Sequence, residues 1–100
     1  MKKLQIGQIE SKVVRKAKDL KFLIYKLASQ SNKGAPDRIF ISPYGEVFFM
    51  KFKSEKAKLT QLQKKVIKDM DAYEVEVFVV DYLEFGLEIL AVKNGDVFEC

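Results

Sequence analysis

Apolar residues near the start of the chain recur at the spacing of a helix. Around residues 7–20 they follow one another at steps of three and four, and lysines and one arginine fill the intervening positions. The spacing predicts an amphipathic helix that buries one side. Its apolar positions are Ile6, Ile9, Val13, Val14, Ala17 and Leu20.

The pattern changes at residue 22. Residues 22–28, FLIYKLA, form a short and almost continuous apolar run, which predicts a buried strand. Residues 29–36, SQSNKGAP, are rich in turn-forming residues, which end that strand.

Two further apolar runs, residues 38–42 and 47–53, are separated by Pro43, Tyr44 and Gly45, and predict a β-hairpin. Successive side chains of a strand point to opposite faces, so the second run divides into two sets. Phe48, Met50 and Phe52 share one face, whereas Val47, Phe49, Lys51 and Lys53 share the other. Phe48 and Phe49 are both expected in the core rather than as base-stacking aromatics.

The second half of the chain predicts a helix, a strand and a closing helix. Thr60 and Gln63 have the spacing of a capping box at the start of a helix over residues 60–72. Residues 75–80, VEVFVV, predict a strand, and residues 82–92 a helix that tolerates Gly86. The order of elements predicts an α/β sandwich whose mixed sheet pairs the hairpin antiparallel and the last strand parallel to a neighbour.

The length and composition fit a single domain over residues 1–100. Hydrophobic residues make up 48% of the chain and charged residues 32%, as in soluble globular domains. No apolar run approaches the roughly 20 residues that cross a bilayer, and the first ten residues do not resemble a secretory signal. A cytoplasmic location without membrane attachment is therefore expected, in the bacterial host if the protein is viral.

The chain has no histidine and a single cysteine, Cys100. This composition excludes histidine-dependent triads, internal disulfides and cysteine zinc clusters. Carboxylates, lysines, hydroxyls and amides remain, and such groups favour Mg2+ or Mn2+ if a metal is bound.

Charge is distributed unevenly along the chain. Residues 1–68 carry 17 basic and five acidic side chains, a net charge of +12, whereas residues 69–100 carry a net charge of −8. A basic segment of this size favours a polyanionic partner, although solvated lysines on helix and strand faces explain the same counts equally well.

One segment combines a G-x-PD turn, a hydrophobic strand ending in x-K, and a helix with glutamine in its first turn. It spans residues 33–63, KGAPDRIFISPYGEVFFMKFKSEKAKLTQLQ. In this combination the segment resembles the virus-type replication-repair nuclease (VRR-NUC) domain, a branch of the PD-(D/E)xK nuclease superfamily. The resemblance extends from Glu10 to about Val92. It implies a restriction-endonuclease-like α/β core, a mixed β-sheet flanked by helices.

The resemblance also implies a set of site residues. Glu10 matches the family's helix glutamate, Asp37 the aspartate of the turn, Lys53 the motif lysine and Gln63 the glutamine of the following helix. In the family, the carboxylates hold Mg2+ or Mn2+ for hydrolysis of DNA phosphodiesters, and the lysine orients water or stabilises developing charge. Glu10 and Asp37 are thus the metal ligands that the resemblance implies.

Lys51 departs from this pattern, because KFK stands where the family has E-x-K. An ammonium group has no acceptor and cannot ligate a cation, so we expect Lys51 to pair with Asp37 or Glu10 and to impair metal binding. Neither Glu46 nor Glu55 is expected to replace the missing carboxylate. Taken one at a time the motif residues also have structural explanations: turn and cap residues, or an edge strand protected by lysines.

The resemblance therefore implies a metal-dependent, structure-selective DNA endonuclease, similar to Holliday-junction resolvases of phages, which this chain carries in an inactive form. It also implies a homodimer acting on branched or junction DNA. The alternative is a non-catalytic module that binds branched DNA, and an interaction module without nucleic acid ranks last. Basic residues flanking the site are candidates for phosphate contacts: Lys26, Lys33, Arg38, Lys56 and Lys58.

Overall fold

The computed structural model describes residues 4–27 and 34–95. Within these ranges the predicted elements are all present, and no helix is long and apolar enough to cross a membrane. The turn predicted over residues 29–36 lies mostly outside the described residues. The elements are α1 (Ile6–Asp19), β1 (Leu23–Lys26), β2 (Arg38–Ile41), β3 (Val47–Phe52), α2 (Gln61–Ala72), β4 (Val77–Val80) and α3 (Leu83–Lys93).

The four strands form one mixed sheet in the order β1-β2-β3-β4. The first three strands pair antiparallel, and β4 lies parallel to β3 after the crossover through α2. The predicted topology is therefore confirmed. Strand β3 has a neighbouring strand on each side. The explanation of Lys51 and Lys53 as lysines that protect an exposed edge strand from aggregation is therefore wrong.

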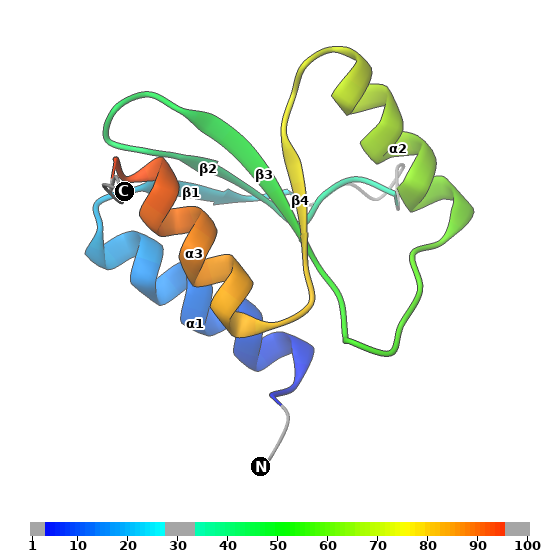
Figure 1. The fold of residues 1–100 in the computed structure, drawn as a ribbon, viewed down its shortest axis with the longest axis horizontal. Helices are drawn as coiled ribbons and strands as arrows, with labels where there is room; N and C mark the ends of the chain where they lie inside the picture. Colours follow the sequence, from blue (N-terminus) through cyan, green and yellow to red (C-terminus); the bar gives the residue numbers. More distant parts are fainter. Residues whose placement is uncertain (1–3, 28–33, 96–100) are drawn as a thin grey trace, which may run out of the picture.

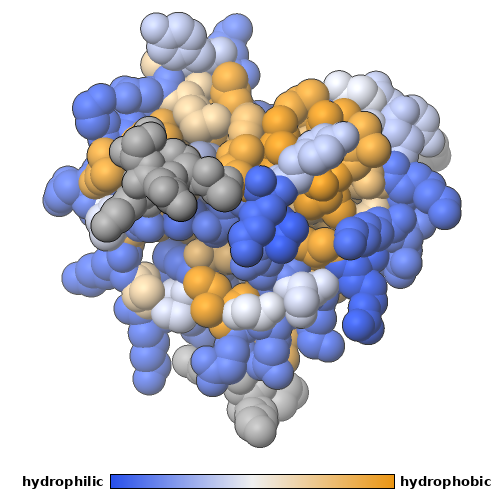
Figure 2. Space-filling model, turned by 180° about the vertical axis from the view of Figure 1, so that it is seen from behind, coloured by the Kyte–Doolittle hydropathy of each residue, from blue (hydrophilic) through white to orange (hydrophobic). Residues whose placement is uncertain are grey.

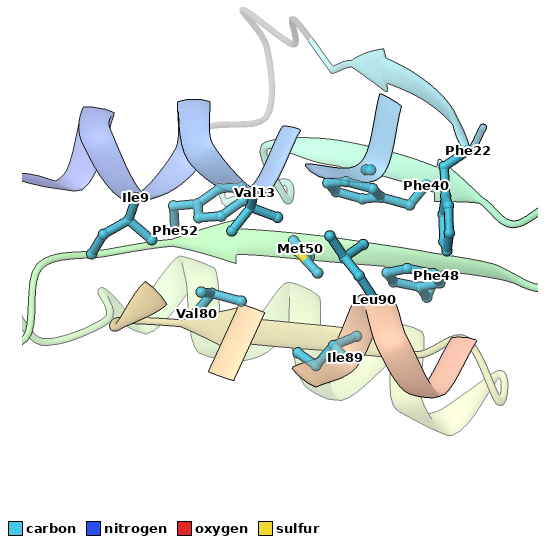
Figure 3. Close-up of a cluster of buried hydrophobic side chains, with 11 residues drawn as sticks. Ile9, Val13, Phe22, Phe40, Phe48, Met50, Phe52, Val80, Ile89 and Leu90 are labelled. Atoms are coloured by element: carbon cyan, nitrogen blue, oxygen red, sulfur yellow. The ribbon is translucent and has the colours of Figure 1, made fainter. Parts of the chain in front are cut away.

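Helices α1 and α3 lie side by side on one face of the sheet, and α2 stands on the other side (Figure 1). The core fills the space between the sheet and the α1–α3 pair (Figure 3). Its central side chains come from β3, and the alternation predicted for this strand is confirmed, since Phe48, Met50 and Phe52 are all buried. Gly86 is buried where α3 approaches α1: an added Cβ would lie 2.7 Å from Cγ2 of Val13, which explains a glycine within α3.

Two burial predictions are wrong. Strand β1 is not a buried strand: Leu23 is 54% exposed and Tyr25 is 55% exposed, because β1 lies at the edge of the sheet and α2, the helix on their face, packs on β4 at the opposite edge. Phe49 is only half-buried, because it points away from the face that α1 and α3 cover, whereas Phe48 is fully buried as expected.

The side chains of the second sheet face are almost all apolar. Strand pairing places them in rows that cross the sheet, and one such row joins Leu23, Ile41 and Val47. Apolar side chains also gather at the surface when the molecule is seen from behind, on the side that carries β1 to β3 (Figure 2). We call this surface the open sheet face, and define it by Leu23, Tyr25, Ile39, Ile41, Val47 and Phe49.

Candidate functional site

Backbone hydrogen bonds hold Asp37 between β1 and β3. Its N–H donates to the carbonyl oxygen of Met50 at 3.0 Å, and its carbonyl oxygen accepts from the N–H of Leu27 at 2.9 Å. The carboxylate accepts a further hydrogen bond, from the N–H of Phe52 to Oδ2 at 2.7 Å. The aspartate of the G-x-PD turn is therefore fixed beside the end of β3.

The ammonium of Lys51 lies next to this carboxylate. Nζ of Lys51 is 3.3 Å from Oδ1 of Asp37, and the two side chains are 14% and 30% exposed. Each oxygen of the Asp37 carboxylate thus has a donor on β3, one a side chain and the other a backbone N–H. The pairing of Lys51 with Asp37, one of the two partners expected from the sequence, is present.

Lys53 leaves the end of β3 and interacts with a different acid. Its Nζ donates to the carbonyl oxygens of Ser54 at 3.1 Å and Ala57 at 2.9 Å, and lies 3.5 Å from Oδ2 of Asp81. Asp81 directly follows β4, whose parallel pairing with β3 brings the two strand ends together. Sequence reasoning missed Asp81, although an acid directly after the apolar run of residues 75–80 was the available signal.

Glu10 of α1 pairs with Arg38 rather than with Lys51. Oε2 of Glu10 accepts from Nε of Arg38 at 2.7 Å, and less than a quarter of either side chain is exposed. The geometry gives Arg38 a carboxylate partner within the protein, which competes with the phosphate contact expected for it. Glu46 lies at the opposite end of β3 from Lys51, with Oε1 3.9 Å from Nζ of Lys93.

The first turn of α2 completes the site. Oγ1 of Thr60 accepts from the N–H of Gln63 at 3.1 Å, and Oε1 of Gln63 accepts from the N–H of Thr60 at 2.8 Å, so the predicted capping box is present. Gln63 also lines an open pocket of about 330 Å³ together with Lys51 and Lys53. Three of the expected site residues therefore meet in one pocket, next to Asp37.

The candidate phosphate-binding residues lie in different parts of the fold. Lys26 is exposed on β1, and Lys56 and Lys58 are exposed in the segment between β3 and α2. Lys33 lies outside the described residues. Of these, Lys58 lines the same pocket as Lys51.

The described residues do not fit the divalent metal that the resemblance to the VRR-NUC domain implies. Across residues 4–27 and 34–95, no three Asp, Glu or Cys side chains come close enough to share an ion. Asp37 and Glu10, the two expected ligands, are each bonded to a cation of the protein, Lys51 and Arg38 respectively. An ammonium beside Asp37 also repels a second cation there.

Comparison with known proteins supports the fold. One solved structure, described as a VRR_NUC domain, superposes with a TM-score of 0.76 over 85% of this chain and 92% of that chain, at 24% sequence identity. No family model and no curated protein matches the sequence. The α/β fold that the resemblance of residues 33–63 implies is therefore confirmed.

Proposed function

We propose that this chain is a DNA-binding domain built on a nuclease fold, in which Lys51 suppresses the metal-dependent cleavage that the fold supports elsewhere. The observation that carries the proposal is the contact between Lys51 and Asp37, because it places a cation of the protein beside the carboxylate best positioned to hold a metal. The resemblance implies a structure-selective endonuclease when position 51 is acidic. With lysine at position 51, we expect the domain to bind DNA without cleaving it.

Charge around the site supports DNA as the partner. Between the end of β3 and the end of α2, lysines outnumber acids, and Lys56 and Lys58 are exposed. Phosphate contacts of this kind supply affinity without reading the base sequence. Such contacts suit a protein that recognises the shape of a junction rather than its sequence.

Binding is tested with a labelled four-way junction and a linear duplex of equal length, in EDTA, by fluorescence anisotropy at several salt concentrations. We expect binding that weakens steeply with salt and is tighter for the junction, with no cleavage when Mg2+ or Mn2+ replaces EDTA. Absence of binding at about 50 mM salt would contradict a DNA-binding function. Equal affinity for the junction and the duplex would contradict the proposed preference for branched DNA but not the DNA-binding function.

We further propose that the domain forms a homodimer through the open sheet face. Tyr25 and Val47 are 55% and 48% exposed there, on strands β1 and β3, and half-buried apolar side chains of β2 lie between them. Monomers rarely expose contiguous apolar patches of this kind. None of the six side chains that define the patch is charged, and Lys51 lies beyond them toward the end of β3, so the patch suits a second copy with an equally uncharged surface better than DNA.

The dimer is tested by introducing a charge into the open sheet face. Val47→Glu is expected to shift the sedimentation of the protein from dimer to monomer and to leave its circular dichroism unchanged, because Val47 is already half exposed in one copy. Glu46→Gln, one residue away but exposed at the hairpin, is the control and should remain dimeric. A wild-type chain that sediments as a monomer at about 100 µM would refute the interface.

A further inference from the structure

The pocket at the end of β3 differs from a carboxylate metal site in the charge of its lining. It holds about 330 Å³, and its polar lining contains three lysines and no acid: Lys51, Lys53, Lys58, Ser54, Thr60 and Gln63. A pocket of this composition attracts an anion rather than a cation.

The three lysines differ in how strongly the protein itself engages them. Lys53 donates to two carbonyl oxygens and lies beside Asp81, so its hydrogen-bonding capacity is largely used. Lys51 donates one hydrogen bond, to Asp37, although an ammonium has three N–H groups. Within the described residues Lys51 and Lys58 therefore retain donors for a ligand.

The acids near the pocket do not cancel this positive charge. Asp37 is bonded to Lys51 and to the N–H of Phe52, and Asp81 lies beside Lys53. Asp37 and Asp81 thus each balance one lysine, and Lys58 forms no ion pair within residues 4–27 and 34–95. The low exposure of the Lys51 side chain, 14%, reduces the screening of its ammonium by water.

We propose that this pocket binds a backbone phosphate of DNA directly on the ammonium of Lys51, with Lys58 as the second contact and without a divalent metal. The inference rests on the proposed DNA-binding function and specifies how the DNA reaches the site. Lys51 supplies at this position the positive charge that a metal ion supplies in a carboxylate site. The departure from the motif thereby converts a metal site into a phosphate site.

The test compares Lys51→Gln and Lys58→Gln with the wild type in EDTA, by anisotropy with the four-way junction over a series of salt concentrations. Each variant should weaken binding about tenfold at about 150 mM salt, and should lower the slope of log K against log salt by about one, the value for one lost phosphate contact. Lys51→Arg, which keeps the charge, should restore most of the affinity. Adding Mg2+ should not strengthen binding by the wild type.

Lys65→Gln is the matched control, because Lys65 is an exposed lysine on α2 whose partner is Asp69, one helical turn away. It should leave the affinity nearly unchanged. An unchanged affinity and slope for Lys51→Gln, in a protein whose wild type binds DNA, would overturn the phosphate site alone. Failure of the wild type to bind any DNA would overturn the DNA-binding function and the phosphate site together. Thermal melts of each variant separate lost binding from lost folding.

Discussion

Replacing Lys51 by glutamate is expected to convert the chain into a DNA nuclease that depends on Mg2+ or Mn2+. The substitution removes the ammonium 3.3 Å from Asp37 and places a second carboxylate beside it, so two acidic side chains become available to a hard cation. Lys53 already lies at the end of the same strand. Cleavage of a labelled four-way junction, followed on denaturing gels, should rise from background by at least about a thousandfold.

Two variants identify the source of this activity. Lys51→Gln removes the ammonium without adding a carboxylate and should remain inactive, because its neutral amide oxygen is a weaker ligand for Mg2+ than a carboxylate. Lys51→Glu combined with Asp37→Asn should lose the gained activity. A glutamate variant that folds and binds junctions, yet cuts nothing with either metal, would favour the non-catalytic binding module.

The sequence predicted the arrangement on β3 because strand alternation is a local property. Lys51 and Lys53 stand two residues apart and therefore share a face, and the hairpin places Asp37 beside the end of β3. The contact between Lys51 and Asp37 follows from this local geometry. The capping box at Thr60 is equally local, since it spans four residues.

The remaining contacts depend on how distant elements pack, and no local pattern contains that information. Asp81 meets Lys53 only because the crossover through α2 sets the parallel register of β4 on β3. Glu10 meets Arg38 across 28 residues, through the packing of α1 on the sheet. The exposure of β1 has a similar origin, because an apolar run is buried on both sides only if layers cover both faces of the sheet.

The same glutamate substitution is expected to destabilise the domain when no metal is present. Lys51 donates to Asp37, and both side chains are at most about a third exposed, so exchanging the cation for an anion replaces an attraction by a repulsion. We expect the free energy of unfolding to fall by about 2 kcal/mol and Tm by about 10 °C, measured by circular dichroism in EDTA. Lys51→Met, which removes the attraction but adds no repulsion, should lose about half as much.

Mg2+ is expected to stabilise the glutamate variant and not the wild type. If the carboxylates at positions 37 and 51 bind Mg2+ together, adding the ion must raise the Tm of the glutamate variant, since a ligand that binds only the folded state stabilises it. The wild type and Lys51→Met should not respond, because the wild type keeps Lys51 beside Asp37 and the methionine variant has only one carboxylate there. A glutamate variant that melts at or above the wild-type temperature in EDTA would show that Lys51 does not neutralise Asp37. A variant that is destabilised but insensitive to Mg2+ and Mn2+ would show that repulsion between the two carboxylates does not create a metal site.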